Sequence, residues 1–251
     1  MSPNSNRSYD YSPVHRVVEV CAIISLGVII AAMGHEVVTS LLGAHAGHGW
    51  WLLAGSALLG YLVADFVSGF VHFLADTFGH EKLFFLGPAF IRPFREHHVD
   101  PRAITRHDFI ETNGNNCIIC IPTALGVYWL LPAQTELWAA FALAFTAWFM
   151  VGIFMTNQFH KWAHLEEIPG WIARLQAWGL ILSPEHHDVH HTPPFDRYYC
   201  ITTGWMNPVL QRLRFFSTLE ATLRFVFRSP KPPLPTPPRR PELTRTGPAA
   251  L

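Results

Sequence analysis

The chain has 251 residues, of which 50% are hydrophobic and only 14% are charged, and its mean hydropathy is +0.20. An average soluble domain carries about 25% charged residues, so this composition excludes an ordinary soluble domain and favours a membrane protein. The formal net charge of zero argues against nucleic acid as the main partner, and four scattered cysteines exclude a disulfide framework.

The first sixteen residues are polar, and two long apolar segments follow them. The first runs from Val17 to about Gly43 and the second from Leu52 to about Leu74. Each is long enough to cross a bilayer, which requires about 20 residues. The loop at 44–49 joins them, and Trp50 and Trp51 then stand where an interfacial aromatic pair is expected. These features predict a transmembrane hairpin.

A polar connection at 77–116 leads to two further apolar segments, Cys117–Leu131 and Leu137–Phe154. Their spacing predicts a second hairpin, although the first of the two is short for a complete span. The chain is mixed and interfacial in character from residue 160. Residues 229–251 contain eight prolines and are predicted to be disordered. We therefore expect a membrane domain over 17–228, flanked by a polar segment, 1–16, and a proline-rich tail.

The basic residues predict the topology. All 18 lysines and arginines lie in 1–16, 82–106 or 161–251, and none falls within the two hairpins. By the positive-inside rule, these three segments face the cytoplasm, and so do both termini. The predicted fold is an all-α integral membrane protein with about four transmembrane helices in two hairpins and a cytoplasmic helical cap.

Four histidines occur within six residues at the spacing His-His-x-x-His-His: His186, His187, His190 and His191. In a helix, residues four apart share one face, so the four rings would project over little more than one turn. Ser183 is the expected N-cap, with Pro184 at the first helical position. The pattern indicates a metal site; a solvated histidine-rich patch is the plain structural alternative.

The predicted topology brings five more histidines to the same membrane face: His72, His97, His98, His160 and His164. Nine imidazoles exceed the roughly four ligands of one zinc ion, so two ions are expected. Imidazole suits zinc, copper, iron and nickel alike. The membrane setting favours iron, because zinc lacks the redox chemistry needed to attack an unactivated C–H bond of a lipid chain. A zinc hydrolase is an alternative, but the residue after His160 is not the glutamate of His-Glu-x-x-His.

Polar side chains near these histidines are candidates to orient the rings by hydrogen bonding. They are Asp76, Glu96, Asp100, His107, Asp108, Asn157 and Asp188. Arg92, Arg95 and Arg106 are candidates to bind a lipid phosphate, with a generic positive-inside role as the alternative. Asp65 lies within a span and is either functional or hydrogen-bonded to a neighbouring helix. Cys117 and Cys120 are either packed thiols or a metal or redox pair.

Several blocks of the chain resemble the plasmanylethanolamine desaturase family. They are Asp65–Thr77, Phe90–His98, Ala103–Gly114, Thr156–His164 and Cys200–Trp205, and together they lie within about residues 60–215. The resemblance implies an integral membrane di-iron enzyme. The family's histidine motif implies metal ligands at His72, His97, His98, His160, His164, His187, His190 and His191, to which we add the adjacent His186.

The resemblance further implies that O2 and two electrons desaturate C1–C2 of a 1-O-alkyl ether phospholipid, forming a plasmalogen. The electron donor would be cytochrome b5, or ferredoxin with its reductase. A fatty-acyl phospholipid desaturase or hydroxylase with the same site is one alternative, and a non-catalytic membrane metal-binding signalling protein is another. The expected location is a bacterial inner membrane, or the endoplasmic reticulum of a eukaryote.

Overall fold

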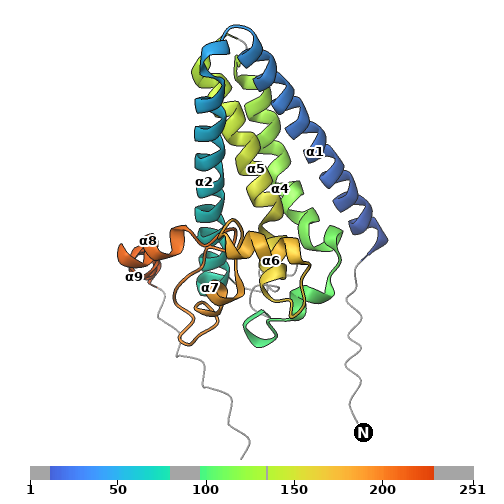
Figure 1. The fold of residues 1–251 in the computed structure, drawn as a ribbon. Helices are drawn as coiled ribbons and strands as arrows, with labels where there is room; N and C mark the ends of the chain where they lie inside the picture. Colours follow the sequence, from blue (N-terminus) through green and yellow to red (C-terminus); the bar gives the residue numbers. More distant parts are fainter. Residues whose placement is uncertain (1–11, 80–96, 134, 229–251) are drawn as a thin grey trace, which may run out of the picture.

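The computed structural model describes residues 12–79, 97–133 and 135–228 of the chain. Four long helices (α1, α2, α4 and α5) form a bundle, and short helices gather at one end of it as a cap (Figure 1). Every regular element in these described ranges is helical. The predicted all-α class with a helical cap is therefore confirmed.

The two helices of the first predicted hairpin are present and follow one another through a short turn, but α1 packs mainly on α4 and α2 mainly on α5. Helix α1 spans Pro13–Leu42, and the Ser12 hydroxyl caps it by accepting a hydrogen bond from the His15 N–H at 3.1 Å. A short 3₁₀ turn, η1, follows at Ala46–His48, and α2 then spans Gly49–Phe78. Both helices are longer than the apolar segments that predicted them, because polar residues at their ends continue the helical hydrogen bonding.

Helix α4 spans Phe109–Leu130, so it begins eight residues earlier than the predicted apolar segment. Asp108 caps it, since its Oδ1 accepts hydrogen bonds of 3.0 Å from the backbone N–H groups of Ile110 and Glu111. The expectation that 109–116 belongs to a polar connection is therefore wrong. Hydropathy misplaced the boundary because the first two turns of α4 carry polar residues.

Those polar residues are buried against α5, which spans Leu137–Ala163. Asn113 donates from Nδ2 to Gln158 Oε1 at 3.2 Å, and Asn116 donates from Nδ2 to the Ile153 carbonyl at 3.0 Å. Helix α5 also continues beyond its predicted end at Phe154, and its last turns reach the cap. The two helices are thus joined by side-chain hydrogen bonds near the cap.

Three segments within the described residues are long and apolar enough to cross a membrane: Pro13–Leu42, Ala46–Phe78 and Leu137–Ala163. Helix α4 is not among them, although it packs against α1 and α5 in the same bundle. The chain is accordingly a membrane protein with at least these three candidate spans.

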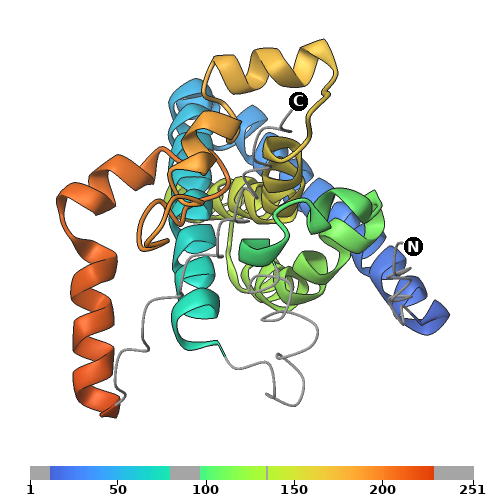
Figure 2. The ribbon, with the colours of Figure 1, turned by 90° about the horizontal axis from the view of Figure 1, so that it is seen from below.

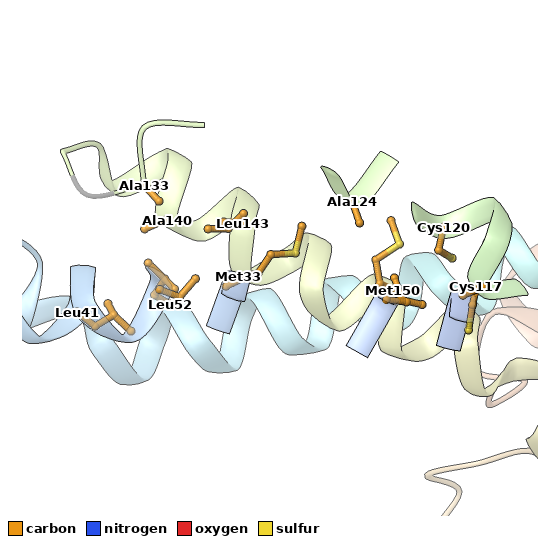
Figure 3. Packing of buried hydrophobic residues seen from close by; sticks show 14 residues of the cluster. Met33, Leu41, Leu52, Cys117, Cys120, Ala124, Ala133, Ala140, Leu143 and Met150 are labelled. Atoms are coloured by element: carbon orange, nitrogen blue, oxygen red, sulfur yellow. The ribbon is translucent and has the colours of Figure 1, made fainter. Parts of the chain in front are cut away.

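Apolar side chains from all four long helices form the main core of the bundle. Figure 3 shows Met33 of α1 beside Leu143 of α5, and Met150 of α5 beside Cys117 of α4. Cys117 and its neighbour Cys120 are buried free thiols within this core. Of the two roles considered for this pair, the structure supports packing.

Two glycines allow α2 and α5 to approach closely. A Cβ at Gly60 would lie 2.8 Å from the Phe145 carbonyl oxygen, and one at Gly152 would lie 2.5 Å from Ala64 Cβ. Small residues at such crossings let helix backbones pack closely in membranes, where van der Waals contact drives association. The α2–α5 contact sets the spacing of the two helices that lead into the cap.

The cap consists of η3 (Ala103–Arg106), α6 (Gly170–Ala177), α7 (Pro184–Asp188), α8 (Met206–Arg212) and α9 (Phe215–Phe227). Figure 2 shows the cap end, with α6 on one side of the bundle and α9 on another, beside α2. Helix α9 packs on the end of α2, where the ring centroids of Phe216 and Phe73 are 5.0 Å apart. Helix α7 lies between these flanking helices, next to the ends of α2 and α5 (Figure 1).

Replacing Gly60 with alanine should destabilise the bundle. The new Cβ would overlap the α5 backbone, and overpacking of this kind costs about 1–3 kcal/mol of unfolding free energy. Thermal unfolding of the detergent-solubilised protein measures the effect as a lowered Tm. Gly126→Ala in α4 is the matched control, because no atom lies within 4 Å of its new Cβ. Equal Tm values for the two variants would contradict the close α2–α5 contact.

Candidate metal centre

Eight histidines and one aspartate gather in two groups at the cap end of the bundle. In each group the ligand atoms lie within 4.8 Å of one another. The five-histidine group consists of His97, His160, His164, His187 and His191. The aspartate group consists of His72, Asp76, His98 and His190. The structure thus brings together eight of the nine histidines that the sequence analysis selected, at two candidate metal sites.

Segments far apart in the chain supply these ligands. Helix α2 carries His72 and Asp76 one turn apart, and α5 carries His160 in its last turn with His164 at its C-cap. The helical turn at 97–99 supplies two adjacent histidines, one to each group. The remaining three come from α7 and the turn that follows it. Because each segment enters from a different direction, the rings converge without a long continuous helix.

In the five-histidine group the Nε2 atoms point at one another. His97 Nε2 lies 2.9 Å from that of His160, 3.0 Å from that of His164 and 2.9 Å from that of His191. His187 Nε2 lies 2.9 Å from that of His160 and 3.0 Å from that of His191. A neutral imidazole has one N–H, so five converging nitrogens cannot all be paired by hydrogen bonds. The arrangement is that of nitrogen lone pairs directed at a shared cation.

In the aspartate group the three rings surround one carboxylate oxygen. Asp76 Oδ2 lies 2.9 Å from His98 Nε2, 3.2 Å from His72 Nε2 and 3.5 Å from His190 Nε2. His190 Nε2 is buried and has no hydrogen-bond partner among the described residues. The sequence analysis assigned Asp76 to ring orientation, whereas its position makes it a candidate ligand.

Backbone carbonyls orient two of these rings. His72 Nδ1 lies 3.0 Å from the Tyr199 carbonyl oxygen, and His190 Nδ1 lies 2.8 Å from that of Arg197. A carbonyl can only accept, so the Nδ1 atoms carry the protons and the Nε2 lone pairs face the aspartate group. Sequence reasoning missed both partners, because every residue has a backbone carbonyl and no side-chain type marks the position.

Burial keeps the rings in the neutral form that binds metal. Desolvation lowers the pKa of His97 and His187 well below the usual histidine value. It also lowers the pKa of His164 and His190 to about 4, and that of His191 to about 3. These four rings of the five-histidine group, and that of His190 in the aspartate group, are therefore uncharged at pH 7. Metal ligation requires neutral imidazole, so these residues meet that condition without any loss of protons.

Helix α7 begins as predicted but does not continue through the histidine quartet. The Ser183 hydroxyl accepts a hydrogen bond from the His186 N–H at 3.3 Å, which confirms the predicted N-cap. The helix ends at Asp188, and the N–H of His190 then bonds to the His187 carbonyl, three residues back, at 2.9 Å. His187, His190 and His191 belong to the two groups, and His186 is not in either group.

The other candidates for ring orientation have different partners. Asp100 pairs with Arg106 at 2.7 Å on the surface, and Asp108 caps α4. Asn157 donates from Nδ2 to the Thr112 carbonyl at 3.1 Å, within the α4–α5 contact. His107 lies 2.7 Å from Glu111 through its Nδ1. These contacts support the ends of α4 and the loop before it.

Asp188 is exposed at the end of α7, and Arg106 is exposed on η3. Arg92, Arg95 and Glu96 lie outside the described residues, so the proposed contact of Arg92 and Arg95 with a lipid headgroup stays a prediction.

Asp65 holds the loop before α8 against α2. Its Oδ1 accepts from the backbone N–H groups of Thr202, Thr203 and Gly204 at 3.2, 2.8 and 2.9 Å, and its Oδ2 accepts from that of Met206 at 3.0 Å. The side chain is fully buried. Of the two roles considered for this carboxylate, the structure supports hydrogen bonding, here to a loop of the cap.

Comparison with known proteins agrees with this site. The family model described as the lipid desaturase domain matches residues 61–232, which include all the ligands of both groups. The chain belongs to the lipid desaturase family. It is therefore an oxidoreductase, and the resemblance found in the sequence is confirmed.

Named relatives extend over most of the chain. A plasmanylethanolamine desaturase of Myxococcus xanthus is 49% identical to this chain. The match covers 84% of this chain and 72% of the Myxococcus protein. Plasmanylethanolamine desaturase 1 of Mus musculus is 44% identical over 84% of this chain and 78% of its own. Fatty acid desaturase 4-like 1 of Arabidopsis thaliana is 31% identical, over 75% and 62% respectively. No solved structure gives a significant match.

Asp65→Ala should loosen the cap of this lipid desaturase. The change leaves four buried N–H groups without their acceptor, and each unsatisfied buried donor costs roughly 1–3 kcal/mol. We expect a much lower Tm and less metal per purified chain. Glu136→Ala is the control, because this exposed acid makes no side-chain cap at α5. A wild-type Tm for Asp65→Ala would contradict the anchoring role.

Proposed function

We propose that the chain is a plasmanylethanolamine desaturase, which introduces the C1=C2 double bond into the 1-O-alkyl chain of an ether phospholipid and so forms a plasmalogen. The observation that carries this proposal is the 49% and 44% identity, each over 84% of the chain, to two proteins with that name. The two candidate metal sites supply a place where such chemistry can occur.

The proposed reaction balances with one O2. Two C–H bonds of the alkyl chain break and one C=C bond forms, which releases two electrons and two protons. A donor such as cytochrome b5, or ferredoxin with its reductase, supplies two more electrons, and the solvent supplies two more protons. O2 takes up all four of each and leaves as two molecules of water.

Two iron ions suit the residues present. The five-histidine group would hold one ion, and the aspartate group would hold the other. Bound iron supplies the electron transfer to O2 that amino-acid side chains lack. The buried His190 Nε2, which lacks a hydrogen-bond partner among the described residues, supports a cation in the aspartate group.

The number of nitrogens favours an ion with more than four ligands. The five-histidine group offers five nitrogens within 4.8 Å of one another, whereas a tetrahedral zinc ion takes four ligands. This number would therefore suit iron better than a structural zinc site.

The protein would position and shield the reacting chain. His72, His187 and His190 are almost completely buried, so water has little access to these ligands. The carbonyls of Tyr199 and Arg197 would keep the ring nitrogens aligned as the charge of the centre changes. Alignment of this kind would limit reorganisation of the ligands during the reaction.

We further propose that α4 completes two transmembrane hairpins, giving four spans with both termini in the cytoplasm. The support is the confinement of all lysines and arginines to 1–16, 82–106 and 161–251, together with the packing of α4 against the apolar helices α1 and α5. The enzyme would then reside in a bacterial inner membrane, or in the endoplasmic reticulum of a eukaryote.

A second candidate function is desaturation of a fatty-acyl chain. The specific observation in its favour is the 31% identity to Fatty acid desaturase 4-like 1. Such an enzyme would use the same metals and O2 with a different chain in the active site. The higher identity to the two plasmanylethanolamine desaturases favours the ether lipid.

Lipid mass spectrometry distinguishes these functions. Cells that lack plasmalogens and are fed a 1-O-alkyl lipid should form vinyl ether when they express the wild type under air. His191→Ala removes a ligand of the five-histidine group and should lower the product by about 100-fold or more. His48→Ala is the control, because this exposed histidine lies in the turn at the opposite end of the bundle.

Absence of vinyl ether from well-expressed wild type supplied with a donor would reject the ether-lipid function. New double bonds in acyl chains would then support the second candidate.

Metal removal tests the proposed iron. Purified protein stripped with a chelator should lose activity, and Fe²⁺ should restore it under air, whereas Zn²⁺ should not, because zinc has no redox chemistry. Metal analysis should find two iron ions per active chain. Activity restored by Zn²⁺, or activity that persists without O2, would point to a hydrolase and contradict the proposal.

A further inference from the structure

His186 lies in the middle of the ligand-bearing stretch, yet its ring faces away from both groups. Its Nε2 atom is 3.1 Å from Asn207 Nδ2 at the start of α8. The adjacent His187 points into the five-histidine group. The quartet thus contains three candidate ligands and one histidine with a different neighbour.

The hydrogen bonds of the Asn207 side chain show which amide atom is the oxygen and which is the nitrogen. Its Oδ1 accepts from the Cys200 N–H at 2.8 Å, and its Nδ2 donates to the Cys200 carbonyl at 2.9 Å. This pair of bonds fixes which end of the amide is the nitrogen. One Nδ2 hydrogen then remains for His186, so His186 Nε2 is the acceptor and its proton lies on Nδ1. The Nε2 lone pair is therefore already in use.

The ring of His186 also fits closely against the backbone. A Cβ at Gly204 would lie 2.4 Å from both Cδ2 and Nε2 of the ring, and Gly204 has a φ of +79° that favours glycine. On another side, the ring centroid of Tyr198 is 4.9 Å away. These contacts hold the ring between α7 and the segment that leads into α8.

The His186–Asn207 contact joins elements that serve both groups. Cys200, bonded twice to Asn207, directly follows Tyr199, whose carbonyl orients His72 of the aspartate group. His186 directly precedes His187 of the five-histidine group. A shift of α7 relative to the 199–207 segment would therefore move ligands of one group against those of the other.

We propose that His186 is a positioning residue and not a metal ligand: its hydrogen bond from Asn207 holds α7 in register with the 199–207 segment and so keeps the two metal sites at a constant separation. This inference rests on the proposed two-metal centre and deepens it. It replaces the assignment of His186 as a ligand that the sequence pattern suggested.

Metal content and metal release test the proposal in the purified, iron-loaded full-length protein. His186→Gln retains an acceptor that reaches about as far as imidazole Nε2, so it should keep both ions and release them to a chelator within about threefold of the wild-type rate. His187→Gln, the matched control, should lose at least one ion. If His186→Gln loses metal as His187→Gln does, His186 is a ligand and the proposal is wrong.

Two further variants test the contact itself. His186→Leu should release metal about tenfold faster. Asn207→Leu should release it at least as fast, because it also removes both bonds to Cys200. The double variant should be no faster than Asn207→Leu alone, because the contact with His186 is already lost there. Wild-type release from His186→Leu, or multiplied effects in the double variant, would overturn the proposal. If His186→Leu does not fold, His186→Ala, which removes the ring and its acceptor without adding bulk beside Gly204, takes its place.

A wild-type protein that binds fewer than two ions would instead reject the two-metal centre, which separates the failure of the proposed function from the failure of this inference.

Discussion

The arrangement of the cap depends on one constraint: eight imidazole rings must be held close together in a small buried volume. The ligand nitrogens of the five-histidine group all lie within 4.8 Å of one another, and several Nε2 pairs are only 2.9 Å apart. Such lone pairs repel one another unless a proton or another cation lies between them. Neutral rings reduce this cost, and burial keeps them neutral, as the lowered pKa of His97 and His187 indicates. Metal binding would supply the remaining stabilisation and would thereby couple assembly of the proposed site to folding of the cap.

The cap stays in place because α2 provides both ligands and anchors. Asp65 binds four N–H groups of the loop before α8, and Ser68, one turn further along, accepts from the Ile201 N–H at 3.1 Å. His72 follows after another turn and bonds to the Tyr199 carbonyl. One face of α2 therefore positions both the loop before α8 and the candidate ligand His72. The packing of the bundle and the geometry of the candidate metal sites depend on the same helix.

Sequence patterns predicted the parts of the site that depend on residue type and spacing. The Ser183 cap and the gathering of distant histidines at one end of the bundle follow from such patterns. They could not predict that His186 turns towards Asn207, because that depends on where α7 ends. Nor could they reveal Asp76 as a candidate ligand or the early start of α4, since both depend on tertiary partners.

The polar first half of α4 has a consequence for how the chain enters the membrane. Asn113 and Asn116 find partners on α5, which is synthesised after α4. Asn113 Nδ2 also bonds to the Phe109 carbonyl within α4, but the side-chain hydrogen-bond partners of Asn116 are on α5. Until α5 emerges, hydrocarbon would leave the Asn116 amide unsatisfied at a cost of several kcal/mol. We therefore expect α4 to wait in a polar environment and to insert as a pair with α5. The order of synthesis, and not hydropathy alone, then governs when the bundle that carries the metal centre is complete.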